Sequence, residues 1–497
     1  MADYLPLLAV IAPALGAVCI ALTGERRANL REFWSVAAGV LLCGLVACMA
    51  PHVLGDKEPG LVLARILPGL ELAFRVDAFG LLFAGGASVL WVVTSFYSIG
   101  YMRSLKEHAQ TRYFACFALA LSTTMGVAFS ANLFTLFVFY EALSLVTYPL
   151  VSHKETDEAK AGARKYIVYL LGAAKVGLLS ALILIYTKTG NLDFESGGIF
   201  AAELIAEHPT LLFVIFGLCL FGFAKNAIMP MHSWLPAAMV APTPVSALLH
   251  AVAVVKAGAF GVVRIVGYVF GVDTLRATGA DIALMLIAAA TILVASVRAL
   301  GEDNLKRRLA YSTIGQLSYI VLGAAVGSVA ALTGAMFHFA GHGFMKIAMF
   351  FSAGALHTEA HRDGVRGLDG LGRQMPMTMT AFALGACGLA GVPLLAGFIA
   401  KWNLGVGALE AGHVVLVGVL VTSGLFNVAY FFPIIYDAFF KAPSGQVREA
   451  GWPMVFPLGV TGAAALCLGV APDLGFHFFT LARLAAESIV AGGGVPQ

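Results

Sequence analysis

The segment GLCLFGFAKNAIMPMHSWLPAAMVAPTPVSALLHAVAVVKAG at residues 217–258 decides the fold of this chain. It begins in an apolar run that reaches Lys225 and ends in a second apolar run that contains Lys256. Proline lacks an amide N–H and clashes with the preceding helical turn, so a proline-rich connection cannot continue as one helix. The prolines between the two lysines are Pro230, Pro236, Pro242 and Pro244. We therefore expect a kinked, partly irregular connection that is screened by protein and has a lysine on either side.

The composition places these two runs in a membrane protein. The chain has 497 residues, of which 60% are hydrophobic and 12% charged, and its mean hydropathy is +0.87. A soluble domain has about 45–50% apolar and about 25% charged residues. A water-soluble globular protein, a disordered chain and a nucleic-acid binder are thereby excluded, and the long continuous apolar runs exclude an outer-membrane barrel. The prediction is an all-α polytopic membrane protein with about 14 transmembrane helices.

Positive charge fixes the orientation of these helices. If each predicted helix crosses the membrane in the direction opposite to the one before it, 18 lysines and arginines lie on one side of the membrane and 6 on the other. The basic side is then cytoplasmic by the positive-inside rule. We expect a multi-pass protein of the cell inner (plasma) membrane with both termini extracytoplasmic, a retained first helix and a short extracytoplasmic hairpin at 56–76.

No cofactor is expected in this chain. Its seven cysteines are scattered without a CxxC pair, so thiolate ligands for zinc or an iron–sulfur cluster are not indicated. Neither a GxxxxGK[ST] phosphate loop nor haem ligands appear. Any redox chemistry is therefore expected in other chains, and no catalytic chemistry is assigned to this one.

Six charged residues occupy the middle of apolar runs. They are Lys175, Lys225, Lys256, Lys346, Lys401 and Glu141. Arg264 and Arg298 lie nearer helix ends and are expected to snorkel towards water. A charged side chain at the centre of a membrane-spanning helix costs about 2.5–3.5 kcal/mol of insertion free energy. The six residues should therefore face the interior of the helix bundle, pair with each other, contact water or lose their charge. A row of such groups suits a proton relay, whereas one or two of them could serve only to join helices.

Histidines extend this pattern. His250 precedes Lys256 by six residues, and His338, His342 and Lys346 are spaced by four. Residues four apart share one helix face, so these three form a polar stripe, for proton passage or for helix–helix hydrogen bonds. The HxxxH spacing could hold zinc, but a third ligand and an HExxH base are missing, and no metal is predicted.

The lysine spacing predicts an inverted repeat. Lys346 follows Lys175 by 171 residues, and Lys401 follows Lys225 by 176. Two blocks of five helices, at 112–271 and 280–440, would enter the membrane from opposite sides, as in many transporters. Residues 1–111 would hold helices 1–3, and 441–497 helix 14. Helices 7 and 12 are expected to be broken, near Pro230 and Pro393.

Three segments together resemble one family. They are 225–264 with its WLP and PTPVSALLH motifs, EDNLKRRLAYSTIGQLSYI at 302–320, and 338–354. They are similar to the antiporter-like membrane chains of respiratory complex I (the NADH-quinone oxidoreductase chains L, M and N), of Mrp-type cation/proton antiporters and of membrane-bound hydrogenases. The resemblance covers about residues 75–440. It implies a central axis of Glu141, Lys225, Lys256 and Lys401, with His250, His338 and His342 as relay histidines.

The chain also departs from the family pattern. Asn226-Ala227 and Ala237-Ala238-Met239 replace a proline, an aspartate and a second histidine that many members carry. Lys175 and Lys346 are possible additional relay residues, and Lys175 matches no known role.

The resemblance implies a proton-translocating subunit of a multisubunit complex. The segment FYEALSLVTYPLVSHKETDEAKAG at 139–162 resembles Mrp-type D subunits and hydrogenase-associated relatives more than the complex I subunits, and a subunit similar to the Mrp D type is expected. The first alternative is a proton-pumping subunit of a redox-driven complex. A solute carrier that binds anions on its lysines and a scaffold with a vestigial relay are rivals from other classes. Expected partners are other membrane subunits, the lipid bilayer, protons and Na+ in a neighbouring subunit, and no nucleic acid.

Overall fold

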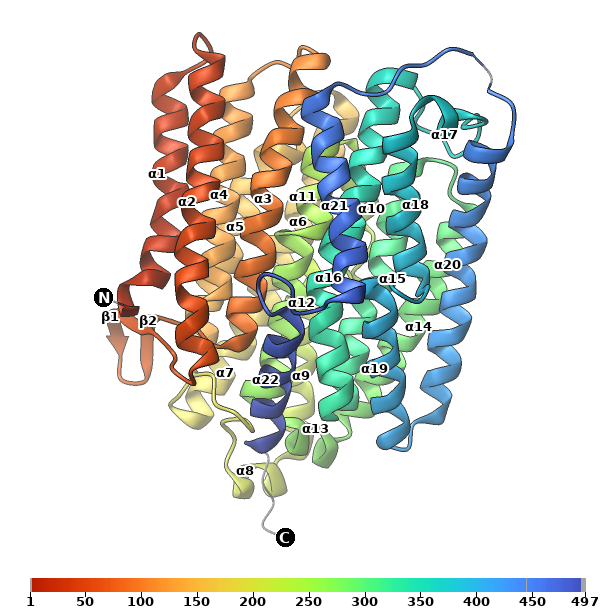
Figure 1. Cartoon of the computed structure of the whole chain (residues 1–497). Helices are drawn as coiled ribbons and strands as arrows, with labels where there is room; N and C mark the ends of the chain where they lie inside the picture. The colour runs from red at the N-terminus through yellow and green to blue at the C-terminus, as the bar shows by residue number, and fades with distance from the viewer. Residues whose placement is uncertain (1, 444, 493–497) are drawn as a thin grey trace.

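The computed structural model describes residues 2–443 and 445–492, except for the side chains of residues 249 and 250. It is a bundle of long helices that run between two ends of the molecule (Figure 1). Within the described residues, nine helices are long and apolar enough to cross a membrane, and the bent pair Val254–Phe270 with Val272–Thr278 could make a tenth. The other predicted spans are shorter, broken or more polar helices. The predicted all-α polytopic fold is confirmed.

The N-terminal part consists of three helices and a hairpin. Its elements are α1 (Leu5–Thr23), α2 (Ala28–Leu54), β1 (Gly60–Leu67), β2 (Leu70–Arg75) and α3 (Ala78–Ser104). The two strands pair antiparallel from Gly60 opposite Arg75 to Leu67 opposite Leu70. This is the hairpin predicted at 56–76. Asp77 caps α3 by accepting a hydrogen bond from the Gly80 N–H at 2.8 Å, as short polar side chains do at helix starts.

The first block of five spans follows. Its elements are α4 (Gln110–Ala128), α5 (Leu133–Val151), α6 (Asp157–Ala173), the π-helical turn η2 (Ala174–Leu179), α7 (Ser180–Thr189), α8 (Ala202–Glu207), α9 (Pro209–Gly222), η3 (Ala224–Asn226), α10 (Trp234–Ala237), η4 (Ala238–Val240), α11 (Thr243–Ala251), α12 (Val254–Arg264) and the π-helical turn η5 (Ile265–Phe270).

The second block is inverted. Its elements are α13 (Val272–Thr278), α14 (Ala280–Gly301), α15 (Leu305–Val326), α16 (Val329–Ala355), η6 (Leu356–Ala360), α17 (Leu371–Gln374), α18 (Pro376–Ala390), α19 (Ala396–Glu410) and α20 (Val414–Phe440). Figure 1 places α13 at the same end as the β-hairpin, so α14 starts at that end, whereas α4 starts at the other. The two blocks therefore cross the membrane in opposite directions.

Both predicted breaks are present. After α9 ends at Gly222, the chain continues through η3 and an irregular stretch with Pro230 before α10 begins. Between α18 and α19, residues 391–395 are not helical, and they contain Pro393 and Gly391 at φ 95°. A third break is not predicted from the sequence. It falls between α11 and α12, where neither proline nor glycine marks it.

The centre of the bundle is α16, which packs on helices of every part of the chain, among them α3, α11, α15, α18, α19 and α21. Residues 331–355 of α16 are all buried. After α21 (Trp452–Val470) the sequence predicts no further helix, but α22 (Phe478–Ala491) packs on α16 and α3. Its Phe478, Leu481, Ala482 and Ala485 are buried. At 14 residues it is too short to be found by a search for membrane spans.

Candidate functional site: a buried row of lysines

The first lysine of the row lies at the broken end of α9. Lys225 is fully buried, and its Nζ lies 3.2 Å from the centre of the Tyr140 ring. Nζ also donates a hydrogen bond to the Tyr140 carbonyl, and the Lys225 backbone N–H donates to the Tyr140 hydroxyl at 3.1 Å. The hydroxyl in turn donates to the carbonyl of Gly222, the last residue of α9, at 3.3 Å. Tyr140 on α5 thus stabilises both the ammonium group and the interrupted helix end.

Glycine allows this arrangement. A Cβ atom added to Gly258 on α12 would overlap the backbone of Lys225 and Asn226. The absence of a side chain therefore brings α12, and with it Lys256, directly against the turn that carries Lys225.

The predicted partner of Lys225 is close but not in contact with it. Glu141 interacts electrostatically with Lys225 and Lys175. The ion pairs within 4.0 Å among the described residues do not include Glu141. Its Oε1 is buried without a hydrogen-bond partner within the described part of the chain. The structure therefore shows the Glu141–Lys225 pair in an open arrangement.

One of the five mid-span lysines does not face the interior. The side chain of Lys175 is exposed on the surface of the bundle, so of the alternatives expected for a mid-span charge it does not take the interior position. It lies in η2, where the wider π-helical turn shifts the faces of α6 and α7 relative to each other. Hydropathy alone does not reveal such a turn.

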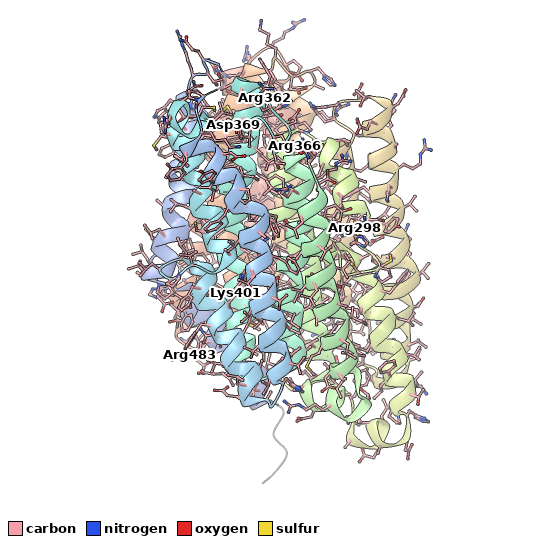
Figure 2. The ribbon with its side chains drawn as sticks, turned by 90° about the vertical axis from the view of Figure 1, so that its right-hand side faces the viewer. Arg298, Arg362, Arg366, Asp369, Lys401 and Arg483 are labelled. Atoms are coloured by element: carbon pink, nitrogen blue, oxygen red, sulfur yellow. The ribbon has the colours of Figure 1, made fainter. Side chains whose placement is uncertain are left out.

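Arg264 is a second correction. Instead of snorkelling, it is buried, with 1% of its surface exposed, and it forms an ion pair with Asp77 at the start of α3. Arg264 Nη2 donates to Asp77 Oδ1 at 2.7 Å. The guanidinium also lies 4.7 Å from the ring centre of Phe260 and 4.8 Å from that of Tyr268. Asp77 is 187 residues away in sequence, so this pairing could not be anticipated. Arg298, by contrast, is exposed on the side of the bundle (Figure 2).

The second lysine of the row, Lys256, lies against α16. It is 1% exposed; its Nζ donates to the Phe339 carbonyl and lies 4.4 Å from the centre of the Phe339 ring. The adjacent His338 is fully buried and lies within electrostatic range of Lys256, Lys346 and Lys401. The rings of His338 and His342 are 5.6 Å apart. His338 is thus the group between the lysines of the two blocks. The side chain of His250, also predicted for the relay, lies outside the described residues.

A hydrogen-bonded chain begins at Lys346. Its Nζ donates to Ser312 Oγ at 2.9 Å, and the Tyr430 hydroxyl lies 3.2 Å from the same Oγ. Tyr430 also donates to Asn427 Oδ1, and Asn427 Nδ2 donates to the Ser423 carbonyl at 2.7 Å. These groups are all buried.

The chain continues from Ser423 towards the last lysine. The Tyr319 hydroxyl donates to Ser423 Oγ at 2.6 Å, and Lys401 Nζ lies 5.0 Å from the centre of the Tyr319 ring. The tyrosines and Ser423 were missed by the sequence analysis, because uncharged polar residues in apolar helices give no signal of their own.

Lys401 lies at the second helix break. Its Nζ donates to the carbonyls of Leu389 at 2.7 Å and Ala390 at 3.2 Å, the last residues of α18. A cation is favoured there because the carbonyl end of a helix carries partial negative charge. Figure 2 shows Lys401 near mid-height of the bundle. It borders an apolar hollow of 590 Å³ between α19 and α20 and is partly exposed there.

The repeat spacing reappears in these contacts. Ser312 is 171 residues after Glu141, as Lys346 is after Lys175. In the second block Lys346 hydrogen-bonds Ser312, and in the first Lys175 interacts electrostatically with Glu141. The two blocks thus place corresponding residues together, with a carboxylate in one and a hydroxyl in the other.

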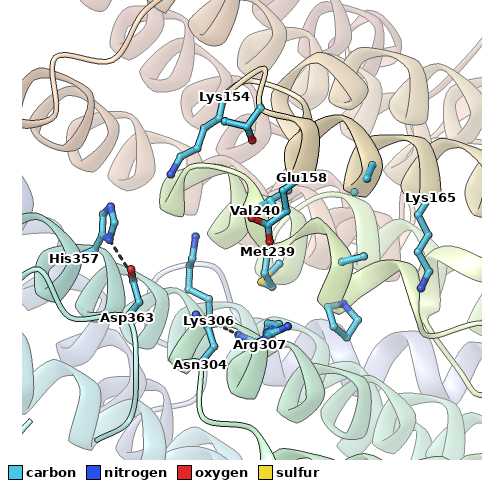
Figure 3. A pocket seen from close by; sticks show the side chains of 15 residues that line it. Lys154, Glu158, Lys165, Met239, Val240, Asn304, Lys306, Arg307, His357 and Asp363 are labelled. Atoms are coloured by element: carbon cyan, nitrogen blue, oxygen red, sulfur yellow. Dashed lines mark hydrogen bonds and ion pairs between the residues drawn. The ribbon is translucent and has the colours of Figure 1, made fainter. Parts of the chain in front are cut away.

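A polar hollow of 620 Å³ opens at one end of the bundle (Figure 3). Its lining includes Lys154, Glu158, Lys306 and Arg307, together with His357, whose Nδ1 is 2.8 Å from Asp363 Oδ1. Lys306 Nζ donates to the Ala241 carbonyl at 3.0 Å, in the segment between η4 and α11. The hollow therefore reaches the proline-rich connection between Lys225 and Lys256.

The fold and the site define a multi-pass membrane protein with two inverted helix blocks around a buried row of lysines. The profile of the family described as "NADH:quinone oxidoreductase/Mrp antiporter, TM" matches residues 130–427. The chain belongs to this family.

Named relatives come from both branches of the family. The chain is 33% identical to NADH-quinone oxidoreductase subunit N of Desulforudis audaxviator, over 95% of this chain and 96% of that protein. It is 32% identical to the A/B subunit of a probable K+/H+ antiporter of Rhizobium meliloti over 88% of this chain, but spans only 44% of that relative.

Two solved structures share the fold. A chain of the Mrp complex from Dietzia sp. superposes with a TM-score of 0.87 at 23% identity, with 99% of both chains covered. A chain of the membrane-bound sulfane sulfur reductase, an archaeal respiratory membrane complex, gives 0.86 at 25% identity, covering 98% of this chain and 97% of that one. The predicted family and architecture are confirmed.

Proposed function

We propose that this chain is a proton-translocating subunit of a hetero-oligomeric membrane complex and that protons move along its buried lysine row. The observation that carries the proposal is the continuity of the row. At Gly258 the helix that carries Lys256 lies against the turn that carries Lys225, His338 lies in electrostatic range of three lysines, and a hydrogen-bonded chain begins at Lys346 and leads towards Lys401.

Glu141 is the proposed switch. Burial disfavours the charged form of a lysine, and a nearby carboxylate favours it. When Glu141 approaches Lys225, the ammonium is stabilised; when Glu141 withdraws, Lys225 passes its proton on. Because the groups interact, they titrate jointly rather than one by one.

The proton reaches the row through the polar hollow at the proline-rich connection. The lysines and the arginine that line this hollow lie on the side of the membrane that the positive-inside rule assigns to the cytoplasm. We therefore also propose that the protein lies in the plasma membrane with both termini outside the cytoplasm. A reporter enzyme that is active only outside the cytoplasm, fused after Gln497, should be active if this orientation is correct. A fusion that is expressed but inactive contradicts it.

The decisive test is transport by the purified complex in vesicles. Lys225→Ala should abolish proton movement while the complex still assembles, because the first cation of the row is lost. Lys188→Ala, at an exposed site near the end of α7, is the matched control and should transport normally. Normal transport by the Lys225 variant would overturn the relay.

Two energy sources fit this site. The Mrp-type assignment predicted from the sequence agrees with the 32% identity to a subunit of a probable K+/H+ antiporter, whereas the similarity over 96% of an NADH-quinone oxidoreductase chain favours a redox-driven complex. Mass spectrometry of the complex, gently purified from native membranes, separates them. Small hydrophobic Mrp-type chains without redox proteins would identify an ion-gradient antiporter; iron–sulfur, flavin or nickel proteins would identify a redox pump. In either case we propose that no cofactor binds within the lysine row itself.

A further inference from the structure

Four titratable side chains gather at the end of the bundle where α3 and α5 finish. Glu107 and His108 lie in the connection from α3 to α4, and His153 and Glu155 in the connection from α5 to α6. None of them belongs to the lysine row. His108 and His153 are 45 residues apart in sequence, so their spacing gives no metal-binding motif.

Three of these residues have the geometry of a metal-binding group. One ligand atom from each of Glu107, His108 and His153 lies within 4.8 Å of the other two. Glu107 Oε2 is 3.8 Å from His108 Nδ1 and 3.9 Å from His153 Nε2. Zinc bonds of about 2.0–2.1 Å in a tetrahedron put ligand atoms about 3.3 Å apart. Small side-chain rotations would therefore close the group around one ion.

His153 supplies independent support. Its side chain is completely buried, yet neither ring nitrogen has a hydrogen-bond partner within the described residues. Buried polar atoms almost always have a partner, so a buried imidazole that faces the Glu107 carboxylate without one is suited to bind a ligand.

The surrounding charges leave the group accessible. Arg112 donates from Nη1 to Glu155 Oε1 at 2.7 Å and from Nη2 to the His153 carbonyl at 3.3 Å. Its charge is thus paired with Glu155. His108 is exposed and Glu107 partly so, which gives an ion a path from solvent.

We propose that Glu107, His108 and His153 bind a divalent transition-metal ion of the zinc class. Two imidazoles and one carboxylate suit zinc rather than magnesium or calcium, which prefer oxygen ligands. Water would complete the tetrahedron. The ion would tie the α3–α4 connection to the end of α5, the helix that carries Glu141.

Metal binding is measured directly on the full-length chain, purified through a tag without histidine and stripped by a chelator. Calorimetric titration with Zn2+ should show one site, and Co2+ should give the intense visible absorption of a tetrahedral complex. His108→Gln lies at an exposed position that does not threaten folding, and should weaken Zn2+ binding at least tenfold. His153→Gln should do the same and abolish the tetrahedral Co2+ spectrum.

The control variant is His208→Gln, an exposed histidine at the other end of the bundle, which should bind Zn2+ as the unmodified chain does. The proposal would be overturned if the unmodified chain and the three variants bound Zn2+ with equal affinity, or if the Co2+ spectrum were of purely octahedral type. Because the readout is binding, it is independent of the proposed proton transport.

Discussion

Lys225 and Tyr140 are joined by three contacts: the ammonium lies 3.2 Å from the ring centre, Nζ donates to the Tyr140 carbonyl, and the Lys225 N–H donates to the Tyr140 hydroxyl. Tyr140 directly precedes Glu141 in the chain. Tyr140, which contacts Lys225, and Glu141, which is proposed to control the charge of Lys225, therefore lie on the same turn of α5 and move together.

Replacing Tyr140 should separate these contacts. Tyr140→Phe keeps the ring and the carbonyl, so proton transport should fall only slightly. Tyr140→Leu removes a desolvated cation–π contact worth about 2 kcal/mol and should slow transport about tenfold or more. Transport rates in vesicles measure both. Equal rates for the two variants would show that the ring does not stabilise Lys225.

Gly258 should tolerate no side chain. In Gly258→Ala the new Cβ meets the backbone of Lys225 and Asn226, so α12 and η3 must move apart, and transport should drop several-fold. Gly217→Ala on α9, where a Cβ meets nothing within 4 Å, is the control and should behave normally. If both variants transport alike, close contact between the two segments is not required.

Ser312 should matter for transport more than for folding. Ser312→Ala removes the hydroxyl that joins Lys346 to Tyr430, which interrupts the hydrogen-bonded chain. We expect a two- to tenfold slower proton flux with assembly unchanged. Ser312→Thr keeps a hydroxyl and should retain most of the flux; a rate as low as that of the alanine variant would argue against the chain.

The Asp77–Arg264 pair should stabilise the fold rather than the relay. Arg264→Leu leaves a buried carboxylate without its partner, a change that costs about 3–5 kcal/mol. The melting temperature in detergent should fall sharply, and the double variant Asp77→Asn with Arg264→Leu should recover much of it. If the double variant is no more stable than the single one, the charge is not the source of the loss.

Acid should weaken the protein through His153. Its folded pKa of about 4 lies below the usual 6.5, so between these values the unfolded chain binds the proton and the folded chain does not. The free energy of unfolding should then fall as pH drops from about 6.5 to 4, by up to about 3 kcal/mol.

The measurement is the melting temperature at pH 7, 6 and 5 in the presence of a chelator. His153→Gln should flatten this dependence, while the neighbouring charges Glu107, His108, Arg112 and Glu155 stay in place. An unchanged slope in the variant would assign the acid sensitivity to other groups.

The sequence by itself determined the membrane class, the hairpin, the inverted blocks and the two breaks near Pro230 and Pro393. Each of these follows from local signals: apolar run length, proline chemistry and the spacing of lysines. The family motifs added the axis of Glu141, Lys225, Lys256 and Lys401, whose roles remain predictions until transport is measured.

Only the tertiary structure decided which charges are buried and what they touch. Lys175 faces outward because a π-helical turn rotates its helix, and Arg264 is buried because Asp77 comes from a distant helix to meet it. The hydroxyl chain from Ser312 to Tyr319 and the Glu107, His108 and His153 group likewise join separate elements. Hydropathy and spacing describe one segment at a time, whereas hydrogen bonds and metal sites depend on how distant segments pack.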